Sequence, residues 1–162
     1  MNRDRTMKLG WPDLVIEDIG PEQFADWIDE WRFVLSGRVA PVFLNKFGAW
    51  FLRRPEGPVE LLDVFTGELT VLAGSFEQFQ AEVDDPSWQE VYLGSKVVYQ
   101  LHGAGIIPGA GECYAMVPHP LLGGPDPMLG MPVDPARIMV MPVRAWQSIC
   151  AQAVQACGQG GP

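Results

Sequence analysis

The sequence predicts an α+β fold in which an antiparallel β-sheet meander packs against several amphipathic helices within a single domain. Four short apolar and aromatic segments between residues 41 and 72 are separated by turn residues, as in consecutive antiparallel strands. Flanking segments repeat apolar residues at three- and four-residue intervals, as amphipathic helices do. With 162 residues, 48% of them hydrophobic, the chain is large and apolar enough to form one core without disulfides or a structural metal.

The first predicted helix covers residues 20–37. Pro21 suits the first helical turn, and Glu22 is favoured beside the positive end of the helix. Gly37 is a suitable C-terminal stop. One face of the helix is apolar and should lie on the sheet: Phe24, Trp27, Ile28, Trp31 and Leu35.

The predicted sheet follows directly, with strands near residues 41–45, 48–54, 58–64 and 68–72. The turns between them are Asn45-Lys46, the segment 55–57 and Thr66-Gly67. We expect helices to cover one face, in a single pair of layers. Alternation along the strands would then bury some of Phe43, Trp50, Leu52, Leu61 and Val71.

Two more helices are predicted after the sheet. Ser75 and Gln78 have the spacing of a capping box, and the helix that they begin should end before Pro86. The next helix should run without a break to Gly103 and Gly105. Its predicted buried face comprises Trp88, Val91, Tyr92, Ser95, Val98, Tyr99 and His102.

The C-terminal third predicts two strands and a closing helix. The strands are "CYAMV" from Cys113 and "RIMVMPV" from Arg137. The helix should turn Trp146, Ile149, Cys150, Ala153 and Val154 inward. We expect one domain over residues 1–157 and a flexible tail at 158–162.

The stretch "GAGECYAMVPHPLLGGP" at 109–125 resembles a catalytic site in composition. A nucleophilic cysteine needs a base nearby and a group that lowers its pKa. Alternation instead puts Cys113 on one buried face with Ala115 and Val117, and His119 lies between two prolines on an expected exposed turn. We favour a structural cysteine, with a small hydrolase that uses Cys113 as the alternative.

Cofactor and metal signatures are absent from the sequence. His102, Cys113 and His119 lack the close pairing typical of zinc ligands, and three cysteines without a CxxC pair do not suggest a disulfide framework. The glycines at 103–109 follow a predicted helix, whereas a dinucleotide-binding loop must follow a strand. We therefore expect no cofactor and no metal.

The net charge of −9 is distributed unevenly. Seven acids and no base lie between Leu9 and Trp31, and nine more acids without a base lie between Pro55 and Ser95. Such segments either form a solvated surface or attract a basic protein partner. Direct nucleic-acid binding is disfavoured because phosphate contacts need clustered Lys and Arg.

No apolar run is long enough to span a membrane, and we expect a cytoplasmic protein.

Residues 47–146 resemble the bacterial DUF1851 family, which is associated with the C-terminal domain of the type VI secretion immunity protein Tdi1. The resemblance depends on a "TGE" turn, a serine-capped helix with a phenylalanine, and a "GxGxCY" segment that leads to "PxLGG". The segment "GPEQFADWIDEW" is similar to the end of the GAD-like region that precedes this domain. The matching residues are Thr66, Gly67, Glu68, Ser75, Phe79, Gly109, Gly111, Cys113, Tyr114, Pro120, Leu122, Gly123 and Gly124.

The resemblance implies a non-enzymatic immunity protein that binds a cognate toxin, which is a DNase effector in the best-known member. A nuclease has a basic groove that an acidic surface could occupy. The candidate contact residues surround the predicted helix junction: Glu77, Glu82, Asp84, Asp85, Trp88 and Glu90. Trp88 is either an anchor for the partner or a plug between helices. A structural or ligand-binding module is the remaining alternative.

Overall fold

A computed structural model describes residues 8–129 and 133–159. The N-terminal half contains α1 (Trp11–Leu14), β1 (Val15–Ile16), α2 (Pro21–Ile28), the 3-10 helix η1 (Asp29–Trp31), β2 (Ala40–Asn45), β3 (Trp50–Arg53), β4 (Val59–Leu62) and β5 (Leu69–Ala73). The remainder contains α3 (Phe76–Glu82), α4 (Pro86–Tyr92), α5 (Ser95–Gly103), β6 (Glu112–Met116), η2 (Pro120–Leu122), η3 (Pro127–Leu129), η4 (Pro135–Arg137), β7 (Ile138–Pro142) and α6 (Val143–Gln159).

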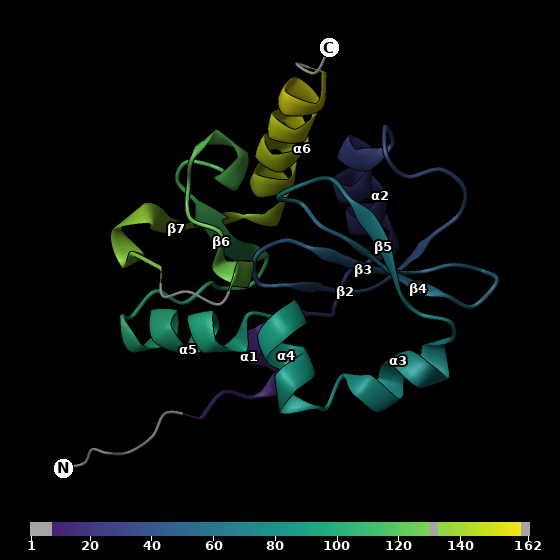
Figure 1. The fold of residues 1–162 in the computed structure, drawn as a ribbon, viewed down its shortest axis with the longest axis horizontal. Coiled ribbons are helices and arrows are strands. Elements are labelled where there is room, and N and C mark those ends of the chain that lie inside the picture. The colour runs from purple at the N-terminus through teal and green to yellow at the C-terminus, as the bar shows by residue number, and fades with distance from the viewer. Residues whose placement is uncertain (1–7, 130–132, 160–162) are drawn as a thin grey trace.

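Strands β1 to β5 form an antiparallel sheet in which every strand pairs with the next along the chain (Figure 1). The predicted meander is therefore confirmed, and β1 is an edge strand that the sequence did not indicate. Strands β6 and β7 form a separate antiparallel pair. A hydrogen bond of 2.8 Å from the Tyr114 amide to the Lys46 carbonyl joins β6 to the turn after β2. The described residues make one compact α+β domain.

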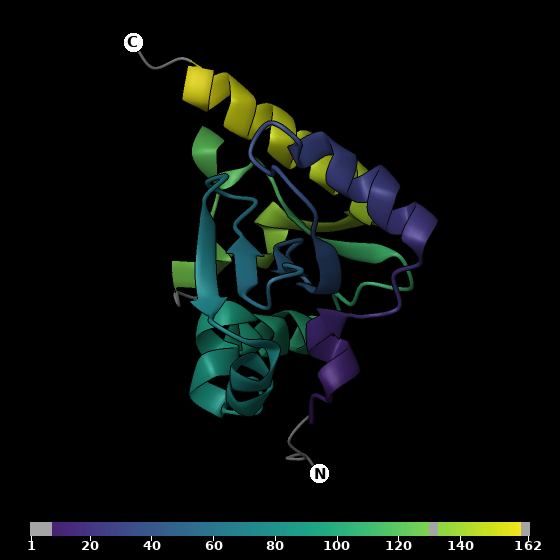
Figure 2. The same ribbon diagram turned by 90° about the vertical axis from the view of Figure 1, so that its right-hand side faces the viewer.

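Helices cover both faces of the five-stranded sheet. Helices α2 and α6 lie side by side against one face, and α3 and α4 lie on the other side (Figure 2). The ring of Trp50 contacts Phe24 and Trp27 of α2, whereas its neighbour Phe51 contacts Phe79 of α3 and Trp88 of α4. The expected single pair of layers is thus wrong, because the three consecutive apolar residues of β3 point to both faces and all need cover.

The helix that follows Pro86 is interrupted, which corrects its predicted buried face. Gly94 takes a left-handed conformation with φ of +60° and is the N-cap of α5. The side chains of α5 therefore do not continue the helical repeat of α4. Val91 and Tyr99 are consequently exposed, and Val97 and Leu101 are buried instead. A Cβ atom at position 94 would lie 2.8 Å from the Phe47 ring, so both the turn and the packing need glycine.

Other predicted core positions divide into confirmed and wrong ones. Most predicted inward residues of the sheet, α2 and α6 are buried. Val71, on the edge strand β5, is 61% exposed, and Val117 and Ile149 are exposed too. The helix predicted to end at Gly37 is shorter: α2 ends at Ile28, and the 3-10 helix η1 follows it directly.

The ends of the chain fall partly outside the described residues. The predicted tail at 158–162 overlaps α6, which reaches Gln159, while residues 160–162 lie outside the described part. The charged segment 1–7 and residues 130–132 of the proline-rich loop lie outside it too. Of the helices that are described, none combines the length and apolar character needed to cross a bilayer.

Candidate functional site

Cys113, the candidate nucleophile, lies fully buried on β6. Burial raises the pKa of its thiol well above the ordinary value, although the nearby positive charge of Lys46 acts in the opposite direction. The thiol therefore stays protonated at neutral pH and out of reach of solvent. This arrangement is typical of a structural cysteine.

His119, the other candidate catalytic group, is only 2% exposed, which corrects the predicted exposed turn. Its Nδ1 accepts a hydrogen bond of 3.1 Å from the Leu121 amide, which leaves Nε2–H to donate to the Val64 carbonyl at 3.0 Å. The ring packs against Phe65 and Trp146. Burial lowers the pKa of the imidazole, so the fold holds it neutral.

The family-like glycines and their neighbours occupy structural positions. Among them, Gly67, Gly111 and Gly123 have positive φ, and a Cβ atom at Gly124 would collide with the Pro118 carbonyl. The others help to shape the loops around β6: the Gly109 amide donates to Glu112, the Tyr114 hydroxyl donates to the Ile106 carbonyl, and Pro120 starts η2. In the part of the chain that is described, no group of three or more His, Cys, Asp or Glu residues could hold a metal ion.

A buried glutamine on α6 is a polar feature that the sequence analysis missed. The Gln147 Oε1 accepts hydrogen bonds from the indole nitrogens of Trp31 at 2.6 Å and Trp50 at 2.9 Å. Its Nε2 donates to the Gly48 carbonyl at 2.8 Å. The three side chains are fully buried. All of these bonds are internal, so the cluster has a structural role.

Four acidic residues on α3 and in the turn before α4 form what we call the acidic corner: Glu77 in the first turn of α3, Glu82 at its last residue, and Asp84 and Asp85 in the turn. Three of them are exposed and Glu82 is half-buried. Asp85 also caps α4 by accepting a hydrogen bond of 3.0 Å from the Ser87 amide. The ion pairs found among the described residues involve Glu60, Glu90 and Asp26, and none involves the acidic corner.

Two other predicted contact residues differ from the acidic corner. Glu90 already faces a cation, because its carboxylate lies 3.6 Å from the Lys96 ammonium. Trp88 is buried against Phe51, Phe79 and Tyr92. Its indole fills the space between the helices and the sheet, so Trp88 is a plug between elements rather than an exposed anchor.

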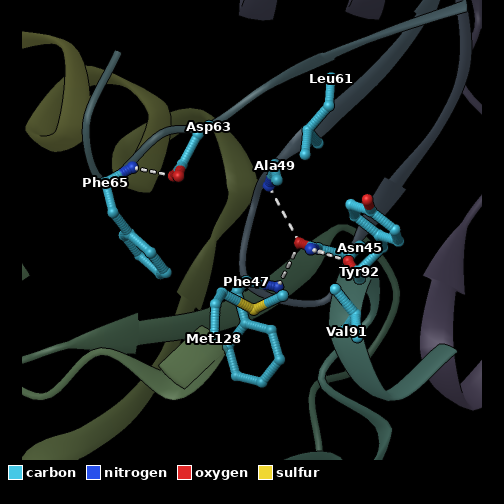
Figure 3. Close-up of a pocket in the computed structure, with 9 residues that line it drawn as sticks. All are labelled: Asn45, Phe47, Ala49, Leu61, Asp63, Phe65, Val91, Tyr92 and Met128. Carbon is cyan, nitrogen blue, oxygen red and sulfur yellow. Dashed lines mark hydrogen bonds between the residues drawn. The ribbon is translucent and has the colours of Figure 1, made fainter. Parts of the chain in front are cut away.

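A small pocket opens beside the C-terminal end of α4 (Figure 3). Its volume is about 190 Å³. The turn between β2 and β3, the β4–β5 hairpin, α4 and η3 contribute its walls, most of which are apolar: Phe47, Ala49, Leu61, Phe65, Val91, Tyr92 and Met128. Asn45 and Asp63 are its polar residues.

Neither a protein-family model nor a curated protein matches the chain. The resemblance to the DUF1851 family consequently stays a prediction based on the motifs above.

The acidic corner and the pocket lie at opposite ends of α4. Asp85 precedes the first residue of this helix, and Val91 and Tyr92 at its last turn line the pocket. Val91 lies six positions after Asp85, a rise of about 9 Å along a helix axis. Beyond the pocket, Val91 is 57% and Leu129 is 70% exposed, on a second hollow that Met128 also lines. The charged and apolar features are therefore close enough to contact one partner.

Proposed function

We propose that this protein is a non-enzymatic, immunity-type protein that acts in the cytoplasm by binding and neutralising a cognate bacterial toxin through its acidic corner. A basic nuclease is the toxin class that fits best. The observation that carries the proposal is a set of four carboxylates on α3 and in the turn before α4, with no cation paired to any of them among the described residues. The resemblance to the DUF1851 family points in the same direction.

The physical argument concerns complementary charge. Four carboxylates on α3 and in the turn before α4 favour a negative potential on this part of the surface. Arg53, whose guanidinium lies 4.2 Å from the ring centroid of Phe76 beside Glu77, forms no ion pair with any of them. A nuclease concentrates Lys and Arg where it contacts phosphates. Opposite charges steer such partners together and, when they become desolvated in the complex, slow its dissociation. Occupation of that groove by the acidic corner would block the substrate without any chemistry by the inhibitor.

The burial of Cys113, the candidate nucleophile, supports a binding protein rather than a cysteine-dependent hydrolase. A hydrolase would need the Cys113 thiol exposed and activated, whereas the thiol is buried and its pKa is raised. The ring nitrogens of His119 are both engaged by backbone groups. Neither group is therefore poised for proton transfer to a substrate.

The test uses the full chain and the product of a neighbouring toxin gene. A corner variant carries Glu77→Gln, Glu82→Gln, Asp84→Asn and Asp85→Asn, and the last of these changes retains a side-chain oxygen that can cap α4. A matched control removes the same charge from the other acidic segment through Glu17→Gln, Asp18→Asn, Glu22→Gln and Asp29→Asn, all exposed positions. Binding is measured by calorimetry at about 50 mM and about 300 mM salt, where screening of exposed charges differs.

We expect the corner variant to bind the toxin at least about tenfold more weakly than the natural chain, because close charge pairs at interfaces contribute more than about 1.4 kcal/mol. It should also fail to protect cells that express the toxin. The control variant should keep most of its affinity and its protection. Absence of a complex at low salt together with absence of protection would refute the proposal, and so would equal losses in the two variants.

A further inference from the structure

The pocket beside α4 has the size of a single side chain. Its volume of about 190 Å³ exceeds the cavity of about 150 Å³ that encloses a benzene molecule and is smaller than typical ligand pockets of about 300–1,000 Å³. Rings of Phe47, Phe65 and Tyr92 contribute to the walls (Figure 3). It is open to solvent at its rim, where Val91 is exposed. The occupant should therefore be one side chain of a bound protein.

Asp63 is the only carboxylate among the described residues that line the pocket. Its Oδ1 accepts a hydrogen bond of 2.8 Å from the Phe65 amide. Its backbone is fixed within the β4–β5 hairpin by bonds to Glu68 and Gly67, of 2.9 and 2.7 Å. In the described part of the chain, no Lys or Arg nitrogen lies within ion-pair distance of its carboxylate. The fold thus holds a negative charge in a fixed position with capacity for another hydrogen bond.

The other polar side chain of the wall is already satisfied. The Asn45 Oδ1 accepts hydrogen bonds from the Phe47 and Ala49 amides, and its Nδ2 donates to the Tyr92 carbonyl (Figure 3). Asn45 therefore organises the pocket and offers little to an incoming group. Polar recognition in the pocket depends on Asp63.

We infer that this pocket receives an arginine side chain of the partner, with the guanidinium at Asp63 and the aliphatic stem among the aromatic rings. The inference rests on the proposed function, and it names the partner's chemistry at a second contact point. A guanidinium is planar and weakly hydrated, stacks on aromatic faces and forms two-pronged bonds with carboxylates. An ammonium loses more hydration on entry, and a neutral apolar side chain would leave Asp63 desolvated without a counter-charge.

The position of the pocket suits simultaneous contact with the acidic corner. About 9 Å of helix α4 separates Asp85 of the acidic corner from Val91 of the pocket, whereas an ordinary protein interface covers about 800 Å² on each partner. One basic partner can therefore place one arginine in the pocket while other cations face the acidic corner. The pocket would supply the central, desolvated contact, and the acidic corner the surrounding charge.

The experiment uses small probes on the isolated full-length protein. N-acetyl-arginine amide is titrated while the amide signals of the protein are followed by NMR, and the citrulline and leucine analogues are titrated in parallel. Citrulline has the same shape as arginine without the charge. We expect the arginine probe to bind at least about tenfold more tightly than either analogue, since charged hydrogen bonds contribute about 1.5–3 kcal/mol. The largest shifts should occur at Phe65 and Tyr92.

Two variants test whether Asp63 causes the preference for arginine over citrulline. Asp63→Asn keeps an oxygen for the Phe65 amide and should remove the preference for arginine over citrulline. Glu68→Gln removes an exposed charge from the same hairpin, outside the pocket, and should leave the preference unchanged. Thermal unfolding confirms that both variants are folded. Equal binding of arginine and citrulline, or an unchanged preference in Asp63→Asn, would overturn the inference.

The probe titration separates this inference from the proposed function because it does not involve the toxin. If the toxin binds through the acidic corner while the arginine probe does not bind, the assignment of the pocket is wrong and the proposed function stands. If the probe binds through Asp63 while no toxin complex forms at low salt and cells are not protected, the pocket is an arginine site and the proposed function is wrong.

Discussion

Replacement of Gln147 by leucine should strongly lower the free energy of unfolding. Leucine is similar in size but leaves three buried groups without partners: the indole N–H groups of Trp31 and Trp50 and the Gly48 carbonyl. Each unsatisfied buried group costs about 1–3 kcal/mol. Because the surroundings relax in part, we expect a loss of about 3–6 kcal/mol in the free energy of unfolding. That is a large share of the about 5–15 kcal/mol that stabilises an ordinary domain.

Urea denaturation followed by tryptophan fluorescence measures this loss, since two of the affected groups are indoles. The matched control is Gln152→Leu on the same helix, where the side chain is exposed and donates only to the Ser148 hydroxyl. The control should change the free energy of unfolding by less than about 0.5 kcal/mol. If Gln147→Leu unfolds within about 1 kcal/mol of the natural chain, the hydrogen bonds do not have the role assigned here.

Three further predictions concern pH, backbone conformation and thiol reactivity. Burial lowers the pKa of His119 from its ordinary 6.5, so below that pH the unfolded chain binds a proton that the folded chain does not. Stability should fall as the pH drops through this range, and less steeply in His119→Gln by denaturation between about pH 7 and pH 5. Gly67→Ala should lower the free energy of unfolding by about 1–3 kcal/mol more than Gly105→Ala, because both have φ of +80° and only the former places its Cβ 2.5 Å from Val154. A thiol reagent should label one cysteine of the native protein, and none in Cys157→Ser, since the other two thiols are buried; rapid labelling of a second thiol would contradict the fold.

The strand order could be predicted because the turns are marked in the sequence. Thr66-Gly67 lies where the β4–β5 hairpin closes, and Gly67 has the positive φ that such a turn needs. The sequence also indicates that helices cover both faces of the sheet, since Trp50-Phe51-Leu52 is an uninterrupted apolar run rather than an alternating one. An assumption of strict alternation overlooks this run and leads to a sheet with one open face.

The break between α4 and α5 could not be read from periodicity. Gly94 lies inside a continuous helical repeat, and a single glycine is tolerated within helices. What selects the break is tertiary: the Asn45 side chain binds the Tyr92 carbonyl, and the Phe47 ring leaves no room for a Cβ at position 94. Both residues come from a turn almost fifty positions earlier in the chain, as the separation of 47 between Asn45 and Tyr92 shows.

The candidate site was predictable only in its charged part. Charges on a segment without bases tend to be exposed wherever the segment lies, which the acidic corner illustrates. The inward direction of His119 and the burial of Gln147 depend on hydrogen-bond partners 55 and 97 residues away, Val64 and Trp50. The pocket depends on four separate parts of the chain that meet only in the folded protein. Short-range sequence patterns do not contain that information.

The bond between Gln147 and Trp31 has a consequence for synthesis on the ribosome. The two residues are 116 positions apart, so the Trp31 indole lacks its buried acceptor, the Gln147 Oε1, until α6 has left the ribosome. A nascent chain that ends before Val143, where this helix begins, should therefore hold a loosely packed sheet that proteases cleave readily. Nascent chains long enough for α6 to leave the ribosome should show an abrupt rise in protease resistance, whereas a gradual rise with increasing chain length would show that the core closes without α6.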